Sequence, residues 1–309
     1  MSFAFVFPGQ GSQSVGMMNA YGDLAVVRDT FTEASDVLRQ DIWALVAEGP
    51  AEALNQTVNT QPVMLTAGVA VYRAWQAQGG AAPAFMAGHS LGEYTALVAA
   101  GSLSFADALP LVRYRAEVMQ SAVAEGVGAM AAILGLDDDA VRAVCNEAAQ
   151  GEVVEAVNFN SPGQVVIAGD KAAVERGMEL AKARGAKRAL PLPVSVPSHC
   201  ALMRPAAEKL AQYLASVAVK VPAIPVLHNA DVAAHDNEAA IKDALVRQLY
   251  SPVRWVETVR ALADRGVVQV AECGPGKVLA GLNKRIDERV QAVALSDGTS
   301  LAESKALLV

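Results

Sequence analysis

The segment 88–92, which reads G-H-S-L-G, constrains the fold of this chain more than any other. The apolar run 84–87 before it suits a buried strand, and residues 93–100 after it have the composition of a helix that ends at Gly101. Strand, tight turn and helix in this order are the context of a nucleophile elbow. The sequence therefore predicts an α/β fold in which Ser90 projects from a turn at the edge of a parallel sheet.

Ser90 has the surroundings that a serine nucleophile needs. The glycines at positions 88 and 92 permit a cramped turn in which side chains would clash. This turn aims the Ser90 hydroxyl toward the N-terminus of the following helix, where backbone N–H groups stabilise a developing oxyanion. Because a serine hydroxyl is a poor nucleophile without a neighbouring base, we expect a base elsewhere in the chain.

Composition and charge exclude several other classes of protein. The 309 residues are 53% hydrophobic and 18% charged, which is typical of a globular chain with one large core and a smaller lobe. The net charge of −7 argues against a general binder of nucleic acid or anionic membranes. The three cysteines form no C-x-x-C, so they predict neither a disulfide framework nor a zinc site, and a cytoplasmic protein fits best. No signal peptide and no membrane-spanning apolar run is predicted.

A change of pattern between residues 126 and 193 predicts an inserted domain. Strand and helix patterns alternate there in the order βαββαβ, with strands at 129–136, 153–159, 164–168 and 186–192 and helices at 137–149 and 170–184. This order is that of a ferredoxin-like unit. We expect residues 1–125 and 194–309 to form a large domain of α/β-hydrolase-like architecture around a parallel sheet. Its further elements are predicted as strands at 3–7, 225–229 and 267–273 and helices at 23–48, 61–78 and 104–123.

Four histidines are available as the base. His89 adjoins the nucleophile, so its side chain should point away from that of its neighbour. His235 lies in a polar loop, and His228 ends an apolar strand, which favours a structural role. His199 lies on a loop just after the inserted domain, from which it can reach over the elbow. We interpret His199 as the base; the alternative is a loop histidine that only bonds the backbone. Cys200 beside it is interpreted as a small buried hydrophobic residue.

The residues alone leave three roles open. No acidic residue stands out as the third member of a triad, although Asp231 and Asp236 lie nearest, after the strand that ends at residue 228. A serine–histidine pair needs only an acceptor that fixes the histidine tautomer. Arg115 is either a solvated helix arginine or a guanidinium that grips a carboxylate in the cleft. Gln10 is either an ordinary turn residue or a residue that turns an N–H toward the elbow.

Several motifs along the whole chain resemble those of one family. They are F-P-G-Q-G-S-Q at 7–13, G-H-S-L-G-E at 88–93, Arg115 with M-Q at 119–120, N-F-N-S-P-G-Q at 158–164, P-S-H at 197–199, Q-L-Y-S-P-V at 248–253 and G-P-G-K-V-L at 274–279. With these motifs the chain resembles the malonyl-CoA:acyl carrier protein transacylases of type II fatty acid synthesis and the acyltransferase domains of polyketide synthases. Together they are highly specific, whereas no single one would be.

The resemblance implies a role for each matching residue. The family's Ser–His pair falls on Ser90 and His199, and its malonyl-binding arginine falls on Arg115. Its oxyanion donors fall on the backbone of Leu91 and on Gln10.

The family's histidine is oriented by a backbone carbonyl, which falls on Gln248, in place of an acid. One departure is Ala116, where relatives often carry glycine after the arginine. Alanine there should tighten the helix slightly without removing the arginine.

The reaction that the resemblance implies is ping-pong acyl transfer without metal or cofactor. Malonyl-CoA acylates the serine, and the phosphopantetheine thiol of acyl carrier protein then takes the malonyl group. The first rival interpretation is a serine esterase or thioesterase, which would share the Ser–His pair. The second is a silent docking module for carrier protein, against which the intact pair argues.

Charge predicts where the carrier protein binds. Acyl carrier proteins are acidic and this chain has a net charge of −7, so the encounter requires a local basic patch. The adjacent basic pairs at 187–188 and 284–285 are the candidates, and the alternative is that each pair is merely solvated.

Overall fold

The computed structural model describes residues 2–194 and 196–308. The strands are β1 (Ser2–Phe7), β2 (Phe85–Gly88), β3 (Gly128–Leu134), β4 (Val154–Ser161), β5 (Gln164–Asp170), β6 (Arg188–Pro191), β7 (Val226–Leu227), β8 (Val267–Glu272) and β9 (Gln291–Ala294). The helices that precede the small sheet are α1 (Ala25–Leu38), α2 (Ile42–Glu48), α3 (Ala51–Leu54), α4 (Thr57–Ala77), α5 (Gly92–Ala99) and α6 (Phe105–Ala122). The others are α7 (Asp138–Ala149), α8 (Lys171–Ala183), α9 (Arg204–Leu214), α10 (Glu238–Gln248), α11 (Trp255–Asp264), α12 (Val278–Asn283) and α13 (Gly298–Ser304), with short 3₁₀ turns at Asn19–Tyr21 and Ala201–Met203.

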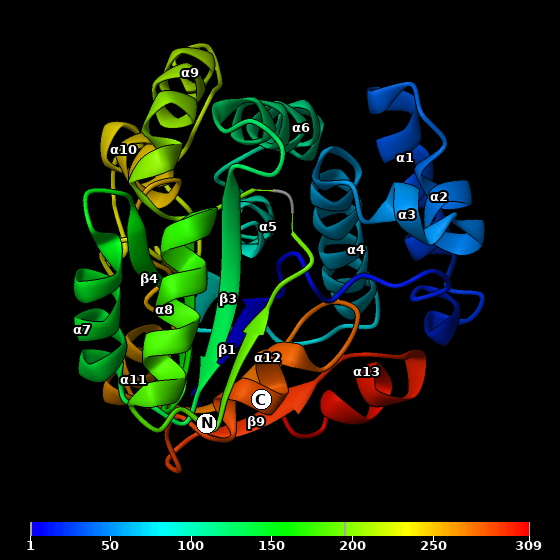
Figure 1. The fold of residues 1–309 in the computed structure, drawn as a ribbon. Helices are drawn as coiled ribbons and strands as arrows, with labels where there is room; N and C mark the ends of the chain where they lie inside the picture. Colours follow the sequence, from blue (N-terminus) through cyan, green and yellow to red (C-terminus); the bar gives the residue numbers. More distant parts are fainter. Residues whose placement is uncertain (1, 195, 309) are drawn as a thin grey trace.

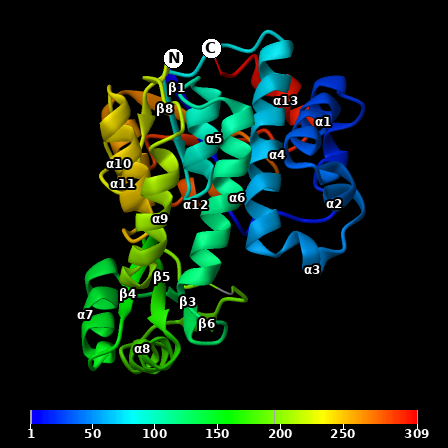
Figure 2. The ribbon, with the colours of Figure 1, turned by 90° about the horizontal axis from the view of Figure 1, so that it is seen from above.

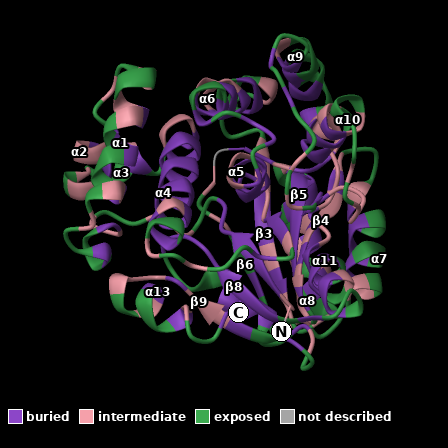
Figure 3. Cartoon of the chain, turned by 180° about the vertical axis from the view of Figure 1, so that it is seen from behind, coloured by how far each residue is buried: buried purple, intermediate pink, exposed green. Residues whose placement is uncertain are grey.

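The larger sheet is parallel and lies between two layers of helices (Figure 1). Its strand order is β7-β2-β1-β8-β9. Side chains alternate along β1, because successive residues of a strand point to opposite faces. The phenylalanines at positions 3, 5 and 7 pack in one core with α4 and α5, and Ala4 and Val6 pack in another with α11 and α12. Figure 3 shows β8 and α4 largely in the colour of buried residues. Because the sheet is buried on both faces, its strands read as apolar runs.

The smaller sheet is antiparallel and carries two helices on one face. Its strand order is β4-β5-β3-β6, and every neighbouring pair is antiparallel. Ile133 and Ile167 pack against α7 and α8, whereas Met130, Val166 and Cys200 form a separate cluster on the opposite face. Cys200 is thus a buried hydrophobic residue, as predicted. Figure 2 shows this sheet with α7 and α8 at one end of the molecule.

Backbone hydrogen bonds join the smaller sheet to the segment before α11. Phe159 N donates to Val253 O at 3.0 Å, and Val253 N donates to Val157 O at 2.8 Å. Strand β4 therefore continues its pairing onto the segment just before α11. This junction ties the smaller sheet to the part of the chain that leads into α11, which packs against the larger sheet.

The structure corrects three predicted elements. The helix predicted at 23–48 is broken, because Arg39 adopts φ of 50° and Asp41 caps a new helix by accepting from Ala44 N at 2.8 Å. The strand predicted at 225–229 is reduced to β7, since Val232 N bonds back to His228 O and turns the chain. The helix predicted at 61–78 begins earlier, at Thr57. Within the described residues, no helix combines the length and the apolar character that a membrane span requires.

Candidate active site

Ser90 lies on a strained turn between β2 and α5. Its φ is 52°, in the left-handed region that favours glycine. The flanking glycines are required by space, because a Cβ on Gly88 would lie 1.9 Å from the backbone of Gly92, and one on Gly92 would lie 2.0 Å from Phe7 O. The turn holds the Ser90 hydroxyl at the mouth of a pocket. This is the geometry of a nucleophile elbow.

His199 forms a hydrogen-bonded pair with Ser90. The distance from Ser90 Oγ to His199 Nε2 is 2.8 Å, and the distance from His199 Nδ1 to Gln248 O is 2.8 Å. A carbonyl oxygen only accepts, so Nδ1 carries the proton and Nε2 presents its lone pair to the serine hydroxyl. His199 N also donates to Leu249 O at 3.0 Å, which ties the loop to the end of α10. The arrangement provides a base that is ready to receive the serine proton.

The surroundings keep His199 neutral. Burial, and after it the positive charge of Arg115, lowers the pKa of His199 from 6.5 to about 3, although the hydrogen bond to Gln248 opposes the shift. A neutral imidazole is the form that accepts a proton. His199 is therefore neutral throughout the neutral pH range, in the form that a base requires.

Arg115 of α6 is buried beside the pair. Only 1% of its surface is exposed. Its Nη1 donates to Gln61 Oε1 at 2.7 Å, and its Nη2 donates to Gln248 Oε1 at 2.9 Å and to Ser90 Oγ at 3.3 Å. Its Nε has no partner among the described residues. Burial lowers the pKa of Arg115, yet a guanidinium remains charged in proteins. A buried cation that lines a pocket is suited to bind an anionic group.

Gln248 bonds four residues of the site. Its backbone carbonyl orients His199, and its side-chain oxygen holds Arg115. Its side-chain Nε2 donates to Ser90 O at 2.9 Å and to Glu93 Oε2 at 3.0 Å. With two acceptors facing Nε2 and a donor facing Oε1, the amide has one orientation.

The loop after β1 lies against the elbow. A Cβ on Gly9 would lie 2.4 Å from His89 O and 3.7 Å from Leu91 N, so glycine permits the close approach. Gln10 follows, and its Oε1 accepts from Thr57 Oγ1 at 3.1 Å. Among the described residues, neither Leu91 N nor Gln10 N has a hydrogen-bond acceptor. Two free backbone donors near the serine are the requirement for an oxyanion hole.

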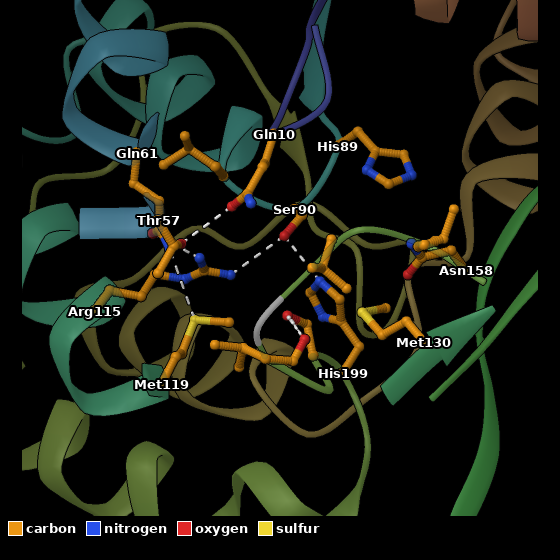
Figure 4. A pocket seen from close by; sticks show the side chains of 15 residues that line it. Gln10, Thr57, Gln61, His89, Ser90, Arg115, Met119, Met130, Asn158 and His199 are labelled. Atoms are coloured by element: carbon orange, nitrogen blue, oxygen red, sulfur yellow. Dashed lines mark hydrogen bonds between the residues drawn. The ribbon is translucent and has the colours of Figure 1, made fainter. Parts of the chain in front are cut away.

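One pocket collects most of the predicted site residues (Figure 4). Gln248 lies behind it, bonded to its lining through Arg115 and His199. The lining residues are Gln10, Thr57, Gln61, His89, Ser90, Leu91, Arg115, Met119, Met130, Asn158, Leu192, Val194, Val196, Ser198 and His199.

The other histidines have structural partners. His89 Nε2 lies 2.8 Å from Asn160 Oδ1, and its side chain turns away from the serine. His228 Nδ1 lies 2.7 Å from Glu93 Oε1. Asp231, one of the two acids considered from the sequence as a triad member, does not bond His199. It bonds His235 at 3.0 Å and Arg247 at 2.7 Å.

Sequence reasoning missed three buried polar residues of the site: Gln61, Glu93 and Asn229. Gln61 carries no local signal, since it lies in the apolar helix α4. Glu93 belongs to the elbow motif and could have been questioned, because a carboxylate in the buried first turn of a helix needs partners. Asn229 follows a strand of two residues and offers no pattern.

Residues 4–295 match the family described as acyl transferase domain. This chain belongs to the acyl transferase domain family. The malonyl CoA-acyl carrier protein transacylase of Escherichia coli (strain K12) is 60% identical to it, over 97% of this chain and 97% of the relative. The protein of the same name from Bacillus subtilis (strain 168) is 47% identical, over 95% of this chain and 93% of its own length.

Solved structures of similar proteins match the fold of this chain over nearly its full length. The crystal structure of acyl-carrier-protein S-malonyltransferase from Burkholderia pseudomallei 1710b has a TM-score of 0.98 and 65% identity, and the match covers 99% of this chain and 100% of the other. A malonyl-transacylase in complex with its type II PKS acyl-carrier protein has a TM-score of 0.98 and 56% identity, with coverage of 99% and 100%.

Proposed function

We propose that this chain is a malonyltransferase that moves malonyl from coenzyme A to the phosphopantetheine thiol of acyl carrier protein, and so supplies fatty acid elongation. The observation that carries the proposal is the buried Arg115, whose Nη2 lies 3.3 Å from Ser90 Oγ. A hydrolase of neutral esters has no need of a buried cation beside its nucleophile. A transferase for an acyl group that ends in a carboxylate does.

In the first half-reaction Ser90 is acylated. Ser90 Oγ attacks the thioester carbon while its proton passes to His199 Nε2. The carbonyl oxygen becomes an oxyanion that accepts hydrogen bonds from the backbone of Leu91 and Gln10. When the C–S bond breaks, the imidazolium returns the proton to the sulfur, and coenzyme A leaves as the thiol. Malonyl remains as an ester of Ser90.

The second half-reaction reverses these steps with another thiol. The phosphopantetheine thiol gives its proton to His199 Nε2 as its sulfur attacks the ester carbon. The ester C–O bond breaks, and Ser90 Oγ takes the proton back. Gln248 O bonds His199 Nδ1–H in both halves and holds the imidazole in the required tautomer.

Arg115 selects the acyl group by its charge. In the absence of substrate its donors face only neutral acceptors on Gln61, Gln248 and Ser90. A malonyl carboxylate offers two oxygens to the guanidinium, whereas an acetyl group offers none. Acetyl-CoA is therefore a poor substrate, because its binding leaves the buried cation without an anion.

The basic pairs at 187–188 and 284–285 are proposed as the surface that meets the acidic carrier protein. Arg285 Nη2 donates to Gln164 Oε1 at 2.8 Å, and Leu134 pairs with both Gln164 and Arg188 across the small sheet. The two pairs thus lie near the same end of that sheet. Among the described residues none of the four side chains makes an ion pair, so their charge is available to a partner.

The architecture proposed for this enzyme has two parts. Residues 126–193 form a ferredoxin-like domain inserted into an α/β-hydrolase-like domain of residues 1–125 and 194–309. The strand order β4-β5-β3-β6, with helices α7 and α8 on one face, supports the first assignment. The nucleophile elbow between β2 and α5 supports the second. The pocket is lined from both parts. A cytoplasmic location is proposed on the three free cysteines, all of them buried.

Intact mass after brief mixing with malonyl-CoA tests the function. The wild-type protein is expected to gain one malonyl group, and Ser90→Ala protein is expected to gain none. Addition of holo acyl carrier protein should discharge the adduct much faster than water does. Discharge at the same rate with and without the carrier thiol would favour the esterase or thioesterase, and a malonyl adduct on Ser90→Ala protein would refute the assignment of the nucleophile.

A further inference from the structure

Asn229 lies just after β7, and its side chain bonds the backbone of the nucleophile elbow. Its side chain is fully buried, with none of its surface exposed. Its Nδ2 donates to Gly88 O at 2.7 Å, and its Oδ1 accepts from Ser90 N at 2.7 Å. These two groups flank the elbow, one on the last residue of the strand and one on the nucleophile itself. A single amide thus bonds the backbone on both sides of the turn.

The orientation of the Asn229 amide is determined by its neighbours. The carbonyl of Gly88 can only accept a hydrogen bond, and the N–H of Ser90 can only donate one. An amide turned by 180° would place oxygen against oxygen and N–H against N–H. The backbone of Asn229 is held as well, because its N donates to Glu93 Oε2 at 2.8 Å. The same oxygen of Glu93 also accepts from Gln248 Nε2 at 3.0 Å. One carboxylate oxygen therefore connects Asn229, which bonds Ser90, to Gln248, which bonds His199.

Two consequences for the elbow follow from these contacts. Ser90 adopts φ of 52°, a strained value for a residue other than glycine. The two hydrogen bonds of Asn229 stabilise the backbone in this conformation. Asn229 also occupies the N–H of Ser90. Leu91 N is then the free backbone donor that the elbow presents to the substrate.

We propose that Asn229 is a positioning residue that holds the Ser90 hydroxyl in line with His199 and reserves Leu91 N–H for the oxyanion. The inference rests on the proposed function, in which Ser90 is the nucleophile. The hydrogen bonds of Asn229 go to the elbow and to Glu93 and not to Arg115 or His199, so it acts on the rate of acylation and not on the binding of the malonyl carboxylate. A displacement of the nucleophile by about 1 Å costs on the order of 10²-fold in rate.

The experiment measures acylation by malonyl-CoA in a quenched-flow mass assay, with rates expressed per folded molecule. Asn229→Leu, which keeps the size but loses both hydrogen bonds, should acylate about 10²-fold more slowly with an unchanged KM. Asn283→Leu is the matched control. Asn283 is also fully buried, and its Oδ1 accepts from Trp255 Nε1 at 2.9 Å, with no hydrogen bond to Gly88, Ser90 or Leu91. It should lower Tm and leave the acylation rate unchanged.

Asn229→Asp covers the case in which the leucine variant does not fold. A protonated carboxyl reproduces the asparagine, because its O–H donates to Gly88 O and its carbonyl accepts from Ser90 N. An ionised carboxylate faces the Gly88 carbonyl oxygen instead. The ratio of the variant rate to the wild-type rate should therefore fall as the pH rises from 5 to 9. A constant ratio, a wild-type rate in Asn229→Leu, or an equal loss in Asn283→Leu would overturn the proposal. If the wild-type protein itself takes up no malonyl, the proposed function fails instead.

Discussion

Replacement of Arg115 by alanine should shift selectivity from malonyl-CoA toward acetyl-CoA. The change removes a buried cation whose two amino groups donate to Ser90, Gln61 and Gln248. Loss of one partner from a desolvated charge pair costs roughly 2–5 kcal/mol, which corresponds to a factor between about 30 and about 4,000. Because Gln10 at the pocket is exposed, water can enter and solvate the malonyl carboxylate in the variant. We therefore expect the lower part of this range, about 30-fold to about 300-fold.

The assay compares kcat/KM for malonyl-CoA and for acetyl-CoA with the same carrier protein. The expected fall is in malonyl transfer, with acetyl transfer unchanged or improved. Arg113→Ala serves as the control, since Arg113 lies on the same helix and bonds Gln40 away from the pocket. A ratio of the two kcat/KM values that is unchanged in Arg115→Ala, or shifted equally in Arg113→Ala, would show that Arg115 does not select the carboxylate.

His199→Ala should slow acylation by about 10²- to 10⁴-fold, as expected for the loss of a positioned base, and near-normal burst kinetics would rule out this role. Folding lowers the pKa of His199 from 6.5 to about 3. Between these pH values the imidazole is protonated in the unfolded chain and neutral in the folded protein. Stability should thus be lost as the pH falls from about 6.5 toward about 3, by up to about 1.4 kcal/mol for each pH unit, and chemical denaturation of His199→Gln protein should show a shallower loss over the same range. Charge reversal at both basic pairs, 187–188 and 284–285, should raise KM for carrier protein and flatten its salt dependence; carrier kinetics that stay unaffected at low salt would place the docking surface elsewhere.

The sequence predicted the elements whose signal is local. The strand at 3–7, the elbow and the four strands between 126 and 193 were recognisable, because apolar runs and turn residues mark them directly. The break at Arg39 was not, since neither Arg39 nor Gln40 is a typical turn residue and the capping by Asp41 was not recognised. Strand β9 was also missed, because a parallel edge strand of four residues carries little pattern of its own.

The residues of the candidate site also differ in how far the sequence alone predicts them. Ser90 and His199 were predicted from residue type and position, because few residues offer their chemistry. Arg115 and Gln10 stayed open until the family motifs were considered, since burial of a helix arginine depends on how distant segments pack. Asn229 was missed entirely: its role comes from contacts with residues about 140 positions away, and no spacing in the sequence records them.

The contact between His199 and Gln248 sets a limit on how the enzyme can be altered. The acceptor is a backbone carbonyl, so every amino acid at position 248 still offers it, and no point substitution deletes the group that fixes the histidine tautomer. The side chain at the same position bonds Arg115 through its oxygen, and it bonds Ser90 O and Glu93 through its nitrogen. A substitution at position 248 therefore alters the support of Arg115 and of the Ser90 backbone together, while the tautomer of His199 stays fixed. Acyl-group preference and the position of the nucleophile are thus coupled through one side chain.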